Sequence, residues 1–166
     1  MTDPKNRRNT LAGQLTYTAA TVSAETGHAA GTDNTRAGNG NPPAAVEEKK
    51  DLPCQLEQKG SGEIFAVYYT ETDETGLVTE NTLELLGEDR VRLTRSGALS
   101  AEFSFFVGVR TEATMVTPYG TLTLTTETDR IRLLREPEQI SLTIIYRFLE
   151  APSETHEVRY RILCGD

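Results

Sequence analysis

The sequence has no tryptophan and only two cysteines and two histidines. Two cysteines are too few for a disulfide scaffold. Cys54 and Cys164 also lack the close spacing of a zinc site, and although a closing barrel could bring them together, we expect free thiols. With only His28 and His156, a histidine-based metal site or catalytic triad is poorly supported. We therefore expect no metal and no cofactor.

Long apolar runs are absent. One of the longest, Leu142–Tyr146, is interrupted by Thr143 and falls far short of the roughly 20 apolar residues of a membrane-spanning helix. The basic residues Lys5, Arg7 and Arg8 are not followed by the apolar stretch of about 7 to 15 residues that a signal peptide needs. The sequence therefore predicts a soluble, cytoplasmic protein with no membrane partner.

Positive charge is scarce. Lys and Arg total 17 against 25 Asp and Glu, which gives a net charge of -8, and the excess of acid lies in residues 51–166. Nucleic-acid binding depends on neutralising phosphates, and an acidic surface opposes it unless its arginines gather on one face. We expect no nucleic-acid partner.

Composition divides the chain into four parts. Residues 25–50 are rich in Gly, Ala, Asn, Thr and Pro and poor in large apolar side chains, which predicts a disordered low-complexity loop. Residues 1–12 are expected to form a flexible N-terminus, residues 13–24 the first strand, and residues 51–166 the main body. Alternation places three residues of the first strand on one face: Leu15, Tyr17 and Ala19.

The main body contains short β-rich runs separated by turn-forming residues. The expected strands are Ile64–Glu71, Leu77–Leu86, Arg90–Thr94, Ala98–Val107, Arg110–Thr117, Thr121–Thr126, Arg130–Leu134, Ile140–Leu149 and Thr155–Cys164. No segment has the 3.6-residue apolar stripe of a helix. The fold class is therefore all-β: a single antiparallel barrel of about 8 to 10 strands, because closure removes exposed edges, although a two-sheet sandwich would also satisfy the pattern.

Apolar residues recur at every second position, so they are expected to share one buried face of the sheet. The expected rows are Ile140, Leu142, Ile144, Tyr146 and Phe148; Ala101, Phe103, Phe105 and Val107; Leu122 and Leu124; and Val158, Tyr160 and Ile162. Thr, Arg and Glu dominate the opposite face. One face of the sheet is therefore expected to be buried and the other to be exposed to solvent.

Several motifs occur in an ordered set. They are Tyr68–Glu71 with Gly76, Val78 and Thr79; Val91–Ala98 followed by Phe103; Pro118–Leu122; and Ile140–Tyr146 before the closing strand. Over roughly residues 62–164 this set resembles the uncharacterised family typified by the Bacillus YwiB protein. The resemblance implies a calycin-like barrel with an interior pocket and no established activity. Two features depart from the family: Met115, where it often has a tyrosine, and the insertion at 25–50.

Arg95 is the most informative single residue. Alternation from Val91 and Leu93 places it on the apolar row at a strand end, where a buried arginine is costly unless it is paired. It would then either anchor an anion or carboxylate of a ligand at the barrel mouth or play a structural part by pairing with an acid such as Glu71.

Three tyrosines are further candidates for ligand contact. Tyr146 and Tyr160 fall on apolar rows, where each would either orient a ligand or complete the core. Tyr119 lies in the turn that resembles the family's proline, aromatic and glycine turn.

Other polar motifs are expected to be structural. Glu71, Asp73 and Glu74 form an acidic cluster that lacks the ligand spacing of a calcium loop, so we expect a solvated turn. Ser61 and Ser96 lack the setting of a nucleophile elbow and are expected in turns.

Three functional hypotheses follow. The first is a noncatalytic barrel that binds a small, partly apolar or anionic ligand in its interior, with Arg95, Tyr119, Tyr146 and Tyr160 as candidate ligand-binding residues. The alternative is a noncatalytic structural or protein-interaction module with a filled barrel. The third is an enzyme whose carboxylates converge only in the fold. The oligomeric state stays open.

Overall fold

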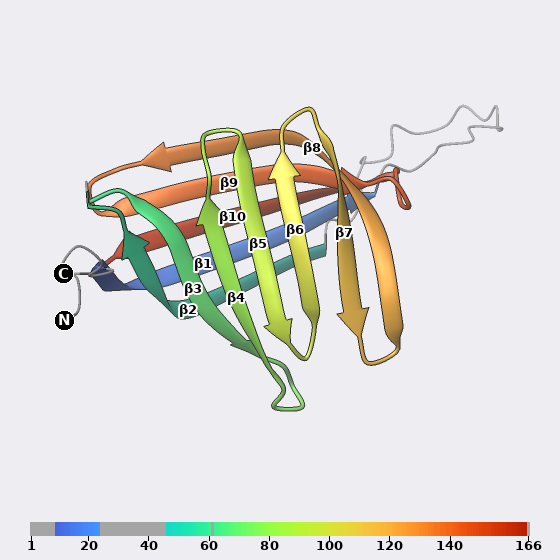
Figure 1. Cartoon of the computed structure of the whole chain (residues 1–166), viewed down its shortest axis with the longest axis horizontal. Coiled ribbons are helices and arrows are strands. Elements are labelled where there is room, and N and C mark those ends of the chain that lie inside the picture. Colours follow the sequence, from blue (N-terminus) through green and yellow to red (C-terminus); the bar gives the residue numbers. More distant parts are fainter. Residues whose placement is uncertain (1–8, 24–45, 61, 166) are drawn as a thin grey trace, which may run out of the picture.

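The computed structural model describes residues 9–23, 46–60 and 62–165. These residues form ten antiparallel strands that close into one barrel (Figure 1). The strands are β1 (Asn9–Ser23), β2 (Val46–Gln58), β3 (Ile64–Thr72), β4 (Val78–Leu85), β5 (Arg90–Gly97), β6 (Ser100–Phe106), β7 (Arg110–Thr117), β8 (Gly120–Arg135), β9 (Gln139–Phe148) and β10 (Glu154–Cys164). The prediction of an all-β antiparallel barrel is confirmed.

The topology is up-and-down. From β2 to β10 each strand pairs with the next, and β1 closes the barrel by pairing with both β2 and β10. Figure 1 shows the steep strands β4 to β7 crossing in front of the long strands β1, β9 and β10. The turns that join β3 to β4, β5 to β6 and β7 to β8 lie at one end, called the hairpin end below. Among the described residues there is no helix long and apolar enough to cross a membrane.

The turns at the hairpin end have the expected chemistry. The Asp73 carboxylate accepts hydrogen bonds from the backbone N–H groups of Thr75 at 2.8 Å and Leu77 at 2.9 Å, and Gly76 has a φ of 85°. Gly97 has a φ of 129°, and a Cβ there would meet the carbonyl oxygen of Val78 at 2.3 Å. Only glycine suits that position, because it is both left-handed and crowded.

The core lies inside the barrel and follows the predicted alternation. Ile140, Leu142 and Ile144 are 3 % exposed or less. Two members of the predicted rows are exposed, since Val107 is 36 % exposed and Leu122 54 % exposed. Val107 lies just after the end of β6, and Leu122 lies near the start of β8, so neither is fully covered by the opposite wall.

The predicted boundaries at the N-terminal side need correction. β1 begins at Asn9, so residues 9–12 are not part of a flexible N-terminus, and β2 begins at Val46, inside the loop predicted over 25–50. No strand was expected between the first strand and Ile64, because the segment that forms β2 is rich in Glu and Lys and contains a proline. It forms because it pairs with β1 over its whole length. Residues 24–45 lie outside the described part.

The two strands predicted at Thr121–Thr126 and Arg130–Leu134 are one strand, β8. Its register with β9 shifts between Thr128 and Arg130, which identifies a β-bulge. The intervening polar residues therefore bend the strand instead of ending it.

β2 and β3 separate on their way to the hairpin end. β2 pairs with β1 from Val46 to Gln58, but its pairing with β3 covers only Cys54 to Gln58. We call the unpaired stretch between Val46–Pro53 of β2 and the end of β3 the seam. Pro53 has no N–H to donate, and Lys49 and Lys50 lie on the same stretch of β2. Proline and lysine are two means by which proteins protect a free strand edge.

Candidate functional site

A cavity of about 190 Å³ lies inside the barrel. It is lined by Tyr17, Leu93, Arg95, Phe103, Phe105, Met115, Ile144, Tyr146, Phe148, Val158 and Tyr160. Aromatic rings form much of the wall, with ring centroids 4.8 Å apart for Phe105 and Tyr146 and 5.3 Å apart for Tyr17 and Tyr160. The strands that supply these residues come from both sides of the barrel, so no local segment makes the cavity alone.

Arg95 is held by two side chains at the cavity wall. Its Nη2 donates to Oε2 of Glu71 at 2.7 Å, and its Nε donates to Oδ1 of Asn81 at 3.0 Å. The side chain of Glu71 is 14 % exposed and that of Arg95 is 28 % exposed. The expected pairing of Arg95 with Glu71 is confirmed, and the same arginine also faces the cavity.

The ion pair extends across the seam. Lys50 on β2 places its Nζ 3.3 Å from Oε1 of Glu71 on β3 and 2.9 Å from Oε1 of Glu48. Side chains therefore connect the two strands where backbone pairing has ended. Lys50 is also the cross-strand partner of Tyr17, which lines the cavity.

The interior tyrosines are protonated hydrogen-bond donors near neutral pH. Burial raises the pKa of Tyr146 and of Tyr160 well above the usual tyrosine range. The hydroxyl of Tyr160 lies 3.5 Å from that of Tyr69. The hydroxyls of Tyr17 and Tyr146 make no hydrogen bond to another described residue, so they can serve a ligand.

Of the four predicted ligand-binding residues, the fold brings Arg95, Tyr146 and Tyr160 together at one cavity. Tyr119 does not join them. It is 99 % exposed in the turn between β7 and β8, where its backbone N–H bonds to Thr117. Tyr119 does not line this cavity, because the turn directs its side chain to solvent, and its contact with a ligand stays a prediction.

The model for a domain of unknown function, DUF1934, matches residues 45–162. The chain belongs to the DUF1934 family. Among solved structures, the crystal structure of the ywiB protein from Bacillus subtilis is similar to it, with a TM-score of 0.65 and 18 % identity over 95 % of this chain and 94 % of that chain. The predicted resemblance is confirmed, and at this identity the structural likeness shows the fold alone. The comparison with curated proteins gives no significant match.

His156 extends the aromatic wall of this DUF1934 barrel beyond the cavity. Its ring lies 5.2 Å from that of Tyr146 in a stacked arrangement, and its Nδ1 lies 3.1 Å from Oγ1 of Thr21. Burial lowers the pKa of His156, while nearby Glu154 opposes the shift. Sequence reasoning did not place His156 inside, although it has the same parity as Val158 in the predicted row.

The other polar motifs are structural in this DUF1934 chain. The acidic cluster divides, since Asp73 organises the turn while Glu71 points to Arg95. Within the described ranges, no three His, Cys, Asp or Glu residues are grouped as metal ligands. Ser96 is exposed near the end of β5, and Ser61 lies outside the described residues.

Cys54 and Cys164 are both free. They flank Gly13 on the neighbouring strands β2 and β10, so they stand about two strand spacings apart, roughly 10 Å, which is too far for a disulfide. A Cβ at Gly13 would meet the Sγ of Cys54 at 3.1 Å and the carbonyl oxygen of Leu163 at 2.7 Å. Burial raises the pKa of Cys54 to about 11, which makes its thiol a weak nucleophile.

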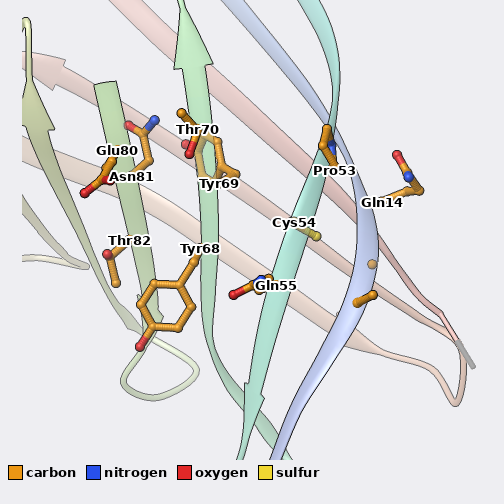
Figure 2. A pocket seen from close by; sticks show the side chains of 12 residues that line it. Gln14, Pro53, Cys54, Gln55, Tyr68, Tyr69, Thr70, Glu80, Asn81 and Thr82 are labelled. Carbon is orange, nitrogen blue, oxygen red and sulfur yellow. The ribbon is translucent and has the colours of Figure 1, made fainter. Parts of the chain in front are cut away.

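A second hollow, of about 700 Å³, lies across β1 to β4 where the seam begins. Figure 2 shows Gln55 on β2, Tyr68 and Thr70 on β3 and Thr82 on β4 along it. Tyr68 donates a hydrogen bond to Glu57 at 2.5 Å. Sequence reasoning did not find this groove, because it arises from the separation of two strands.

Proposed function

We propose that this DUF1934 barrel binds a small, largely apolar molecule in its interior cavity. The observation that supports it is the cavity of about 190 Å³ between aromatic and aliphatic walls. A dry protein cavity of about 150 Å³ accepts benzene. The size therefore suits one aromatic ring with a short substituent, or a fused pair of small rings.

Polar groups at the wall would orient such a molecule. Arg95 lines the cavity, and the hydroxyls of Tyr17 and Tyr146 are available as donors. A few placed polar groups in an apolar site are the usual way in which small-molecule sites set orientation. This division into apolar wall and polar donors favours a ligand site over the filled barrel of the interaction-module hypothesis.

The test uses native mass spectrometry of the freshly purified protein, followed by titration with indole. The chain has no tryptophan, so the fluorescence of added indole can be followed without a tryptophan background. We expect a copurified small molecule or saturable indole binding. The Ile144→Phe variant, which fills the cavity, should lose the indole.

Ile145→Phe is the matched control, because Ile145 is the next residue of β9 and faces the other side of the sheet. It should bind indole like the parent protein. Absence of any bound species, together with no saturable indole binding, would overturn the proposal. Equal indole affinity in the parent and both variants would overturn the interior location.

A further inference from the structure

We propose that the interior site selects a neutral ligand that bears a hydrogen-bond acceptor, such as an aryl ketone, and discriminates against carboxylates. This inference rests on the proposed function and deepens it. Its basis is that the arginine at the cavity wall is already neutralised by an acid of the protein.

The charged groups beside the cavity balance. Lys50 and Arg95 supply two positive charges, and Glu48 and Glu71 supply two negative charges, with closest nitrogen-to-oxygen distances of 2.9 Å, 3.3 Å and 2.7 Å along the chain of contacts. A ligand carboxylate at Arg95 would therefore add an uncompensated charge close to Glu71. Such a charge is costly in the partly desolvated interior, where charges interact more strongly than in water.

Arg95 nevertheless keeps donors for a neutral acceptor. A guanidinium has five N–H groups, and those in use are the Nε–H to Asn81 and one on Nη2 to Glu71. Nη1 makes no hydrogen bond to another described residue. A carbonyl oxygen can accept from such a group without bringing a charge of its own.

The pKa of Tyr17 shows whether the charged groups at this wall favour an anion. Its phenolate would be a negative charge at the cavity wall, and burial raises the pKa of Tyr17 against that form. The carboxylates of Glu48 and Glu71 raise the pKa of Tyr17 further. Their effects outrank the opposing effects of Arg95 and Lys50. The field of the charged groups at this wall therefore does not favour an anion.

The test compares acetophenone with benzoate, which share one ring and differ in charge. Dissociation constants are measured by isothermal titration calorimetry at neutral pH. We expect the parent protein to bind acetophenone at least about tenfold more tightly than benzoate. In Glu71→Gln, Arg95 loses its counter-charge, so the affinity for benzoate should rise about tenfold relative to the affinity for acetophenone.

Glu80→Gln is the matched control, because Glu80 also lies in the β3–β4 pair but is exposed and outside the ion-pair chain. It should leave the acetophenone-to-benzoate ratio unchanged. If Glu71→Gln does not fold, Glu48→Gln changes the same charge balance at a side chain that is 53 % exposed. In this variant too, the affinity for benzoate should rise relative to the affinity for acetophenone.

The outcomes separate the two proposals. Equal binding of benzoate and acetophenone by the parent protein would overturn the selection of neutral ligands and leave the interior site standing. A ratio that does not change in the folded glutamate variants would also overturn it. Absence of binding by acetophenone, benzoate and indole alike would instead overturn the proposed function.

Discussion

Lys50 and Glu71 connect two strands that no longer pair, with 3.3 Å between Nζ and Oε1. The last backbone pair joining these strands before the seam is Cys54 with Tyr69. Beyond it, the ion pair spans the gap between the two strands. The same glutamate binds Arg95 at the cavity, so the seam and the interior site share one residue.

The first prediction concerns the seam. In Lys50→Met the contact with Glu71 is lost, so hydrogen exchange of the backbone amides from Val46 to Leu52 should become faster. The free energy of unfolding should fall by only about 0 to 1 kcal/mol, because Lys50 is 39 % exposed and solvent screens the pair. Lys49→Met, on the opposite face of β2, is the control. Equal exchange rates in the two variants would contradict the role of Lys50.

The second prediction concerns Arg95. Arg95→Met removes the hydrogen bonds to Glu71 and Asn81 and leaves Glu71 with Lys50 as its cationic partner, so the free energy of unfolding should fall by about 1 to 3 kcal/mol. Binding of acetophenone should weaken in the same variant. Chemical denaturation and calorimetry measure the two effects. A loss of stability with no effect on ligand affinity would show that Arg95 is structural only.

The third prediction compares two neighbours on one face of β9. Ile144 lines the cavity, whereas Leu142 is fully buried and does not line it. Leu142→Phe should lower the free energy of unfolding by about 1 to 3 kcal/mol, because a closely packed site has no room for the larger side chain. Ile144→Phe should lower the free energy of unfolding by a smaller amount, because the phenylalanine ring can enter the cavity. Equal losses in denaturant titrations would indicate that the cavity collapses.

The fourth prediction concerns acid. Burial lowers the pKa of His156 below its ordinary value of 6.5, so the unfolded chain binds a proton over a pH range in which the folded chain does not. The free energy of unfolding should therefore fall as the pH falls below about 6.5, toward the folded-state pKa. Above that range His156 is neutral in both the folded and the unfolded state, so it contributes nothing to the pH dependence of the free energy of unfolding.

His156→Phe should reduce that slope and keep an aromatic ring against Tyr146. Denaturation at about pH 7.5 and about pH 5.5 measures the slope before most carboxylates titrate. An unchanged slope in the variant would assign the acid sensitivity to other groups.

Local patterns predicted much of the barrel. Alternation from Val91 and Leu93 placed Arg95 at the interior and made Glu71 a reasonable partner, because a strand repeats every two residues whatever it packs against. The same rule placed Tyr146 and Tyr160 at one wall. Tyr119 was a candidate because of its turn motif, and alternation gives no information there, because a turn has no alternating faces and the hairpin sets the direction of its side chain.

Neighbouring residues and short turns were enough to predict most of the strands from Ile64 onward, their buried faces and their antiparallel order, although β8 was expected as two strands. Three features depend on contacts between segments that are distant in sequence: the polar segment Val46–Gln58 forms a strand, it leaves β3 at the seam, and the barrel keeps a cavity. Pairing with β1 organises β2 against its own weak strand propensity. The size of the cavity depends on the volumes of side chains that are distant in sequence and meet only when the barrel closes.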